Sequence, residues 1–319
     1  MADPISDRRI ADRHVHPIGL GVMQLSDPSM LSERPRAMAT VHAALDSGVN
    51  LLDTANIYAP DGARFGHNEE VLGEALRTWG GSPADRARVV VVTKGGITRA
   101  PGPDGDVWGR AGSPEAIGAA ARASVRRLGV DVIDLYFFHR LDPTIHFDEQ
   151  IGGLAQVRAD GIARHIGLSN VTLAMLDRAL ELVGGPDEGG IVAVQNELSP
   201  RFRRDTDVLE RCIERGIAFL PWSPLGGASE ARDLGSRYAA FAEIADERGV
   251  SPQQVALAWL LALGPQVIPI PGSSRPATAR ASAAAAGIEL TAEELARLSA
   301  TVPEDISAFP SDDWPAPPM

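Results

Sequence analysis

The stretch VVVVTK, residues 89–94, has apolar side chains at successive positions of an extended chain and ends on a lysine. Apolar residues at every position are typical of strands in a parallel sheet whose two faces are both covered. Seven further runs have this character: IGLGVM (18–23), VNLLD (49–53), VIDLYFFH (132–139), ARHIGLS (163–169), IVAVQN (191–196), IAFLPW (217–222) and VIPIPG (267–272). The sequence therefore predicts eight buried parallel strands.

Helix signals lie between these runs. Residues 113–129 offer Ser113 as N-cap, Pro114 at the first helical position and Gly129 as C-terminal stop. Residues 251–264 repeat this scheme, and TAEELARL (291–298) opens with a capping box. A helix after each strand predicts a single-domain (β/α)8 TIM barrel over residues 1–319.

Three segments fall outside the repeating pattern. RRIADRHV (8–15) is interpreted as a small strand pair at the floor of the barrel. Residues 95–112, rich in Pro and Gly, are interpreted as a long loop at the carboxyl ends of the strands, where the active sites of this fold lie. The C-terminal tail, residues 301–319, is expected to lie over the same mouth.

Composition narrows the class of protein. The net charge of −12 disfavours nucleic acid or an anionic membrane surface as a partner. No run reaches the roughly 18 to 20 apolar residues that span a bilayer, and no apolar signal core follows the N-terminus. A soluble, cytoplasmic protein is therefore expected, in which the single cysteine, Cys212, is a buried apolar residue.

Lys94 is the only lysine among 30 basic residues; the others are arginines. A chain that uses arginine almost exclusively has kept an amine at this one position. A lysine ammonium is compact and its pKa shifts readily, whereas a guanidinium is bulkier and permanently charged. Lys94 is therefore a candidate functional residue.

Other polar residues stand at the ends of neighbouring runs. Asp53 ends the second run, Lys94 the third and His139 the fourth, and Tyr58 follows in the loop after Asp53. Consecutive strands of a barrel are neighbours, so these side chains are expected to meet at its mouth. A cation close to a phenol stabilises the phenolate, so Lys94 is expected to lower the pKa of Tyr58 and make it a usable proton donor. His139 is expected to orient a carbonyl oxygen.

Simpler roles remain open for each of these residues taken singly. Asp53 is also compatible with a helix cap, Tyr58 with an ordinary tyrosine, and His139 with a core histidine. A barrel isomerase or hydrolase with Asp53 and His139 as acid and base is another alternative, but it leaves Lys94 and Tyr58 without a purpose. No spacing of metal ligands supports a metal site.

The ordered set of motifs resembles the aldo-keto reductase family over nearly the whole chain. The resemblance rests on GLGVM (19–23), GVNLLDTANIY (48–58), VVTKGG, YFFHRLDP (136–143), GIARHIGLSN (161–170), VQNELSP (194–200), FLPWSPLGG (219–227) and IPIPGSSRP (268–276). It implies reduction of an aldehyde or ketone by hydride transfer from NADPH. Asp53, Tyr58, Lys94 and His139 then form the family's catalytic tetrad, with Tyr58 as general acid.

The resemblance also implies a cofactor site without the glycine-rich dinucleotide fingerprint, and the sequence carries none. By similarity, Ser169, Asn170 and Gln195 bind the nicotinamide carboxamide and Trp222 stacks on its ring. The pyrophosphate lies under the loop 223–227, and the 2′-phosphate near the start of the helix after the last strand. The cofactor contacts expected are Gly21, Val22, Met23, Asp53, Ser169, Asn170, Gln195, Trp222, Ser223, Pro224, Leu225, Gly227, Ile270, Gly272, Ser273 and Arg275.

The phosphate loop departs from the common pattern of the family. Gly272 stands where well-known family members carry a lysine, and Ser282 stands where they carry an asparagine. Their arginine or glutamine falls near the position of Thr278. Arg275, with Arg280 as a weaker candidate, still offers a guanidinium for phosphate. NADPH is therefore expected, and NADH as a second cofactor is possible.

The substrate is left open by the sequence. Tyr58, Trp108, His139 and Trp314 are expected in the substrate pocket, and Phe138, Arg140 and Phe309 are further candidates. The partner expected is a small carbonyl compound, and the protein is expected to be a monomer or a small homo-oligomer. A regulatory or redox-sensor protein that binds the cofactor with little turnover is the alternative function.

Overall fold

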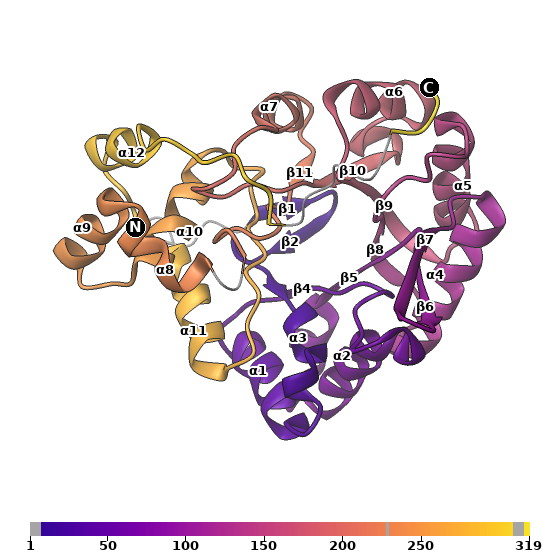
Figure 1. The fold of residues 1–319 in the computed structure, drawn as a ribbon, viewed down its shortest axis with the longest axis horizontal. Coiled ribbons are helices and arrows are strands. Elements are labelled where there is room, and N and C mark those ends of the chain that lie inside the picture. Colours follow the sequence, from indigo (N-terminus) through magenta and orange to yellow (C-terminus); the bar gives the residue numbers. More distant parts are fainter. Residues whose placement is uncertain (1–7, 228–229, 309–315) are drawn as a thin grey trace.

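The computed structural model describes residues 8–227, 230–308 and 316–319. Its centre is a curled sheet of seven parallel strands in the order β11-β10-β9-β8-β5-β4-β3, surrounded by helices (Figure 1). The strands are β3 (Leu20–Gly21), β4 (Leu51–Asp53), β5 (Val90–Gly95), β8 (Ile133–Phe138), β9 (Ala163–Ser169), β10 (Ile191–Gln195) and β11 (Ala218–Phe219). This confirms the α/β barrel predicted from the apolar runs.

The eighth run closes the barrel without forming a regular strand. Residues 267–272 make parallel bridges on both sides, Phe219 with Val267 and Gly21 with Gly272. The amides of Gly19 and Gly21 donate to the carbonyls of Pro269 and Pro271. The two prolines have no N–H, so toward β3 this segment accepts hydrogen bonds but donates none, and the ladder on that side is incomplete. The prediction of a continuous eighth strand was therefore wrong, although the ring closes where it was expected to.

The helices around the ring begin at the predicted N-cap residues. Ser113 and Ser251 cap their helices, with a proline at the first position of each, and Thr291 forms a capping box with Glu294. The helices are α1 (Arg34–Asp46), α2 (His67–Thr78), α3 (Pro83–Arg88), α4 (Pro114–Leu128), α5 (Phe147–Ala159), α6 (Leu173–Val183), α7 (Thr206–Glu214), α8 (Glu230–Arg237), α9 (Ala239–Arg248), α10 (Pro252–Ala262), α11 (Pro276–Ala284) and α12 (Ala292–Ser299). Short 3-10 turns are η1 (Met23–Ser26), η2 (Pro28–Met30), η3 (Gly62–Arg64), η4 (Pro186–Glu188) and η5 (Ala285–Gly287).

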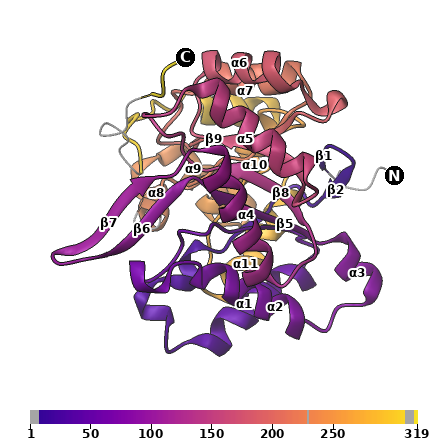
Figure 2. The same cartoon turned by 90° about the vertical axis from the view of Figure 1, so that its right-hand side faces the viewer.

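The segment expected as a long loop is a β-hairpin. β6 (Ile97–Gly102) pairs antiparallel with β7 (Gly105–Arg110), with Gly102 opposite Gly105 across the turn. Gly105 has φ of +122°, a conformation that glycine adopts without strain. In Figure 2 this hairpin projects from one end of the barrel, opposite the pair β1 (Arg8–Ile10) and β2 (Arg13–Val15). The pair β1 and β2 was predicted. Arg13 attaches it to the floor of the barrel by donating hydrogen bonds to Asp134 and to the carbonyl oxygen of Val89.

Side chains alternate between two cores. Val90 and Val92 of β5 point into the barrel, whereas Val91 packs against the surrounding helices. Cys212 lies in the outer core, as expected, and burial raises the pKa of its thiol to about 12. None of the helices in the described part of the chain combines the length and the apolar character needed to cross a bilayer.

Close packing of helices predicts an unusual effect of Gly73 in α2. A Cβ at Gly73 would lie 2.5 Å from the carbonyl oxygen of Leu128, whereas a Cβ at Gly152 in α5 would meet nothing within 4 Å. Gly73→Ala is therefore expected to lower the free energy of unfolding by about 1–3 kcal/mol, despite alanine's higher helix propensity. Gly152→Ala, the matched control, is expected to raise it by about 0.5–1 kcal/mol. Urea unfolding of the two variants checks this, and equal effects would contradict the packing argument.

Candidate active site

The inward-facing positions of the strands change from apolar to polar at the carboxyl ends. Leu51, Val92 and Phe137 belong to the core inside the barrel. Two residues further along the same strands, the alternation brings Asp53, Lys94 and His139 to the mouth. The predicted tetrad residues are therefore the last inward positions of β4 and β5 and the position just after β8.

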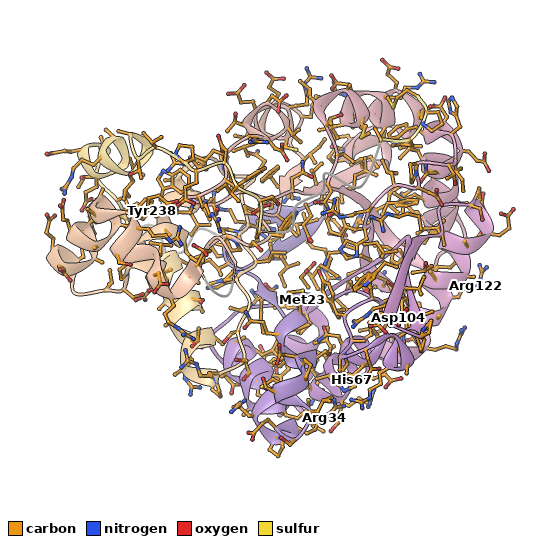
Figure 3. The ribbon with its side chains drawn as sticks, in the orientation of Figure 1. Met23, Arg34, His67, Asp104, Arg122 and Tyr238 are labelled. Carbon is orange, nitrogen blue, oxygen red and sulfur yellow. The ribbon has the colours of Figure 1, made fainter. Side chains whose placement is uncertain are left out.

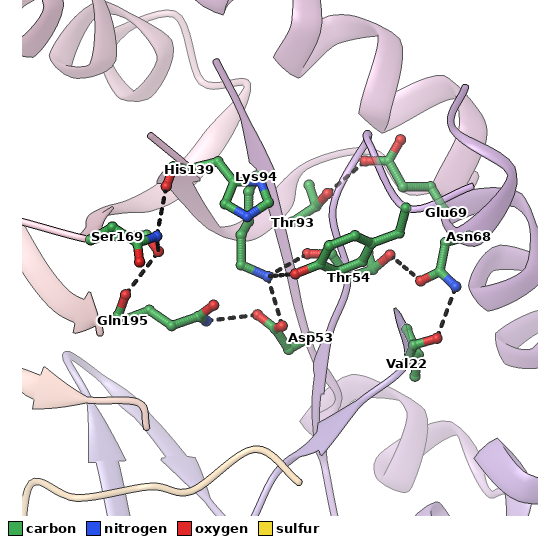
Figure 4. Close-up of polar contacts among 12 residues, drawn as sticks. Val22, Asp53, Thr54, Asn68, Glu69, Thr93, Lys94, His139, Ser169 and Gln195 are labelled. Carbon is green, nitrogen blue, oxygen red and sulfur yellow. Dashed lines mark hydrogen bonds and ion pairs between the residues drawn. The ribbon is translucent and has the colours of Figure 1, made fainter. Parts of the chain in front are cut away.

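Lys94 is the centre of the polar contacts (Figure 4). Its Nζ donates to Asp53 Oδ2 at 2.7 Å and to the carbonyl oxygen of Thr54 at 2.8 Å, and lies 3.5 Å from the hydroxyl of Tyr58. The side chain of Lys94 is fully buried. The ring of His139 meets the ring of Tyr58 edge-on, with the centroids 5.8 Å apart. All four residues of the predicted tetrad are thus brought together.

The surroundings set the protonation states of this group. Burial by itself lowers the pKa of Lys94, but the negative charge of Asp53 and the hydrogen bonds to Asp53 and Tyr58 outweigh it, so the pKa is raised and the amine stays charged. Burial lowers the pKa of His139 well below its ordinary value, and the charge of Lys94 lowers it further. His139 is therefore a neutral imidazole at neutral pH.

The pKa of Tyr58 differs from the sequence-based expectation. Burial raises the pKa of the phenol, and the charge of Lys94 opposes this rise without cancelling it. The expected lowering below the ordinary value was therefore wrong. Burial disfavours the phenolate more than one ammonium 3.5 Å away favours it. Tyr58 consequently keeps its proton at neutral pH and can act as a donor.

The neutral His139 predicts how stability depends on pH. Because its folded pKa is depressed, unfolding below the unfolded value of about 6.5 takes up a proton, and stability falls as the pH falls. Between pH 6.5 and 5, His139→Gln is expected to lose about 1–2 kcal/mol less stability than the wild type. His14→Gln, which changes an exposed histidine on β2, is the control and should follow the wild type. Urea unfolding at several pH values measures both, and parallel curves for all three proteins would contradict a neutral His139.

A row of side chains connects the tetrad to the far wall of the mouth. Gln195 Nε2 donates to Asp53 Oδ1 at 2.9 Å, and the hydroxyl of Ser169 donates to the carbonyl oxygen of Gln195. Asn170 Nδ2 donates to the hydroxyl of Ser169 at 2.9 Å, and Trp222 Nε1 donates to Asn170 Oδ1 at 3.2 Å. These four residues therefore form one hydrogen-bonded wall that ends on the carboxylate of the tetrad.

A cavity of about 840 Å³ lies over these groups. In Figure 3, Met23, which lines the cavity, lies nearer the centre of the barrel than Arg34 or Arg122 on the surrounding helices. The sequence-predicted residues that line it are Gly21, Met23, Asp53, Tyr58, Trp108, His139, Arg140, Ser169, Asn170, Gln195, Trp222, Ser223, Pro224, Leu225, Gly227, Ile270 and Gly272.

Other residues proposed from the sequence lie elsewhere. Lys94 is beneath the cavity floor, and the side chain of Val22 is buried. Ser273 is also buried, and its hydroxyl donates to the carbonyl oxygen of Arg275, so it shapes the turn before α11. Arg275 itself is exposed outside the described cavity. Phe138 belongs to the outer core, and Phe309 and Trp314 lie outside the described residues.

The structure also brings in residues that sequence reasoning missed. The cavity is also lined by Gln24, Ser26, Asp27 and Pro28 after β3, by Arg99 and Arg110 of the hairpin, and by Arg201, Ser307 and Ala308. Asn68 holds the loop that carries Tyr58, because it accepts from the hydroxyl of Thr54 and donates to the carbonyl oxygen of Val22 (Figure 4). Sequence position could have identified some of them, because Gln24, Ser26, Asp27, Pro28 and Arg201 all lie shortly after predicted strands.

Strained backbone lies along the cavity wall. Asn170 and Ser223 have φ of +58° and +45°, values that residues with side chains rarely adopt. A Cβ at Gly21 would lie 2.9 Å from the carbonyl oxygen of Ile270, so the wall admits only glycine there. Such features are concentrated where a backbone approaches a ligand. No group of three or more His, Cys, Asp or Glu that could hold a metal is found in the described part of the chain.

Comparison with known proteins agrees with this architecture. The model of the Aldo/keto reductase family matches residues 17–302. An uncharacterized oxidoreductase of Schizosaccharomyces pombe is 32% identical over 91% of this chain and 88% of its own. Pyridoxine 4-dehydrogenase of Escherichia coli is 31% identical over 91% of this chain and 96% of its own.

A solved structure supports the same assignment. The aldo-keto reductase of Klebsiella pneumoniae in complex with NADPH is 26% identical, with a TM-score of 0.76 over 92% of this chain and 94% of the other. Both the family match and the two relatives cover nearly the whole barrel. The chain therefore belongs to the aldo/keto reductase family and is an NAD(P)H-dependent oxidoreductase.

Proposed function

We propose that this protein reduces the carbonyl group of an aldehyde or ketone to the alcohol, with NADPH as hydride donor and Tyr58 as general acid. The observation that carries the proposal is the hydroxyl of Tyr58 on the cavity wall, 3.5 Å from the buried ammonium of Lys94. A protonated phenol beside a fixed cation is suited to donate a proton and to have the resulting phenolate stabilised.

The residues present fit a nicotinamide dinucleotide. Ser169, Asn170 and Gln195 supply amide and hydroxyl groups to a carboxamide, and the indole of Trp222 supplies an aromatic face. The loop from Ser223 to Gly227 and the glycine at 272 leave room for the phosphates. The Klebsiella relative, which binds NADPH, supports the same choice.

Each chain residue has a separate task in the proposed reaction. When bound, the reduced nicotinamide supplies the hydride that adds to the carbonyl carbon. Tyr58 gives its proton to the carbonyl oxygen, completing the alcohol, and later regains a proton from water. The ammonium of Lys94 stabilises the phenolate in between, and Asp53 holds that ammonium in place. His139, as a neutral imidazole, has one N–H with which to orient the same oxygen.

The residues expected around the 2′-phosphate of the cofactor support a preference for NADPH with some use of NADH. The first-turn amides of α11 have no acceptor within the helix, so its N-terminus favours an anion. Arg275, the N-cap residue, and Arg280 are exposed there and can reach a phosphate. Gly272 contributes no cation, which weakens discrimination against a cofactor without the 2′-phosphate.

The proposal is tested by oxidation of NADPH, and separately of NADH, against a panel of aldehydes and ketones. Pyridoxal belongs in the panel because one relative is a pyridoxine 4-dehydrogenase. Turnover with several carbonyl compounds, faster with NADPH, is the expected result. Tight NADPH binding without turnover of any compound would overturn the proposal in favour of a cofactor-binding regulatory protein.

A further inference from the structure

The cavity is rich in positive charge, although the chain carries a net charge of −12. Arg99, Arg110, Arg140 and Arg201 all line it. The acidic residues in its wall are Asp27 and Asp53, and both are engaged. Asp53 pairs with Lys94, and Asp27 accepts from the amide and hydroxyl of Ser29. The cavity wall is therefore positively charged, whereas the whole chain is negatively charged.

Arg99 and Arg201 have carboxylate partners. Arg99 pairs with Asp106 at 2.6 Å and donates to the carbonyl oxygens of Ala59 and Pro60, so it fixes the hairpin to the loop after β4. Arg201 pairs with Glu230 at 3.5 Å and Glu304 at 3.3 Å. The charges of these two guanidiniums are consequently compensated within the protein.

Arg140 is in a different situation. It directly follows His139 at the end of β8, is half-buried, and lines the cavity. Within residues 8–227, 230–308 and 316–319, its side chain makes no hydrogen bond or ion pair. Burial lowers its pKa, and the charge of Glu197 opposes this. A partly buried cation without an ion pair is costly unless a ligand compensates it.

Arg110 adds to the local excess of positive charge. Burial and the like charge of Arg140 together lower the pKa of Arg110 to about 10, although the charge of Asp142 opposes the fall. The two guanidiniums thus line the same cavity close enough for their charges to interact. Their field also reaches the reacting groups, because the charge of Arg140 acts on the pKa of both Tyr58 and His139. The positive charge of Arg140 therefore acts at the tetrad.

We propose that the substrate is an anionic carbonyl compound whose carboxylate or phosphate group is bound by the guanidinium of Arg140. This inference rests on the proposed function and specifies its substrate class. The planar fork of a guanidinium matches two oxygens of either anion. Arg140 is next to His139 in the chain, so an anion bound there belongs to a small molecule whose carbonyl lies at Tyr58.

The test compares matched substrates that differ in charge. 4-Carboxybenzaldehyde and its neutral methyl ester form one pair, and pyridoxal 5′-phosphate and pyridoxal form the other. The proteins are the wild type, Arg140→Met, Arg140→Lys and the control Arg9→Met, which changes an exposed arginine on β1 at the opposite end of the barrel. Calorimetric binding of benzoate and benzamide to the protein alone gives a readout that does not depend on turnover.

The wild type should prefer the anionic member of at least one pair, and the pair that is preferred identifies the anion. Arg140→Met should lower kcat/KM for that anion by about 10- to 100-fold more than for the neutral member of the pair. Arg140→Lys should restore part of the loss, and Arg9→Met should match the wild type. Benzoate should bind more tightly than benzamide, and only in proteins with a cation at position 140.

Different failures have different meanings. Turnover of all four aldehydes with no charge preference, or an equal loss for charged and neutral members in Arg140→Met, would overturn the anion site and leave carbonyl reduction standing. Weaker NADPH binding in Arg140→Met with unchanged preference would assign Arg140 to the cofactor and overturn the inference. Absence of turnover with any carbonyl compound would overturn the proposed function itself.

Discussion

Replacing Tyr58 by phenylalanine is expected to lower kcat for carbonyl reduction by about 10²- to 10⁴-fold, the usual contribution of a positioned general acid. The substitution removes the hydroxyl 3.5 Å from Lys94 Nζ and keeps the ring that contacts His139. Little binding surface is lost, so the dissociation constant of NADPH should change by less than about 3-fold. Steady-state kinetics and a fluorescence titration with NADPH measure the two quantities.

Tyr238→Phe is the matched control for this substitution. The hydroxyl of Tyr238 lies 3.4 Å from Glu304, away from the tetrad, and its loss should leave kcat unchanged. A Tyr58→Phe protein that retains the wild-type kcat would show that another group or water donates the proton. A large loss of NADPH affinity with unchanged turnover of the bound complex would make Tyr58 a binding residue instead.

The second large effect is expected from Lys94→Met, which leaves the carboxylate of Asp53 buried without its ion pair. Asp53 is 3% exposed and its partner 0% exposed, so water cannot replace the lost ammonium. Removing one partner of a buried pair costs about 3–5 kcal/mol in the free energy of unfolding. Urea unfolding measures this loss. The double variant Lys94→Met with Asp53→Asn should recover part of it, because the uncompensated charge is then removed.

Lys94→Arg separates the charge of Lys94 from its shape. The larger guanidinium must enter a fully buried site in which the amine donates to both Asp53 and the carbonyl oxygen of Thr54. We expect reduced stability and reduced kcat, with less loss of stability than in Lys94→Met. Full activity and stability of the arginine variant would contradict the idea that this position requires an amine.

The tetrad was predictable because it depends on short-range rules. Strand ends follow from the apolar runs, and consecutive strands of a barrel are neighbours, so Asp53, Lys94 and His139 had to lie near one another. Inward or outward orientation follows from alternation along each strand. Gln195 and Ser169, which were expected from the resemblance to the family, are likewise the last residues of β10 and β9.

Other features depend on contacts that a single sequence does not reveal. The hairpin of β6 and β7 was interpreted as a loop because its sequence is rich in Pro and Gly. The two strands nevertheless pair in register from Ile97–Arg110 to Gly102–Gly105. The pKa of Tyr58 was expected to fall because the cation was visible in the sequence and the depth of burial was not. Arg140 was named only as a possible pocket residue, since its lack of an ion pair depends on where every acidic group lies.

Direct reduction of a carbonyl group at the tetrad is best tested by following deuterium into the product from NADPH labelled at the transferable position of the nicotinamide, with mass spectrometry and NMR as readouts. We expect the wild type to form an alcohol with one deuterium on the former carbonyl carbon, and Tyr58→Phe to form almost none. NADPH that binds tightly but leaves its deuterium in place with every aldehyde and ketone would contradict this mechanism.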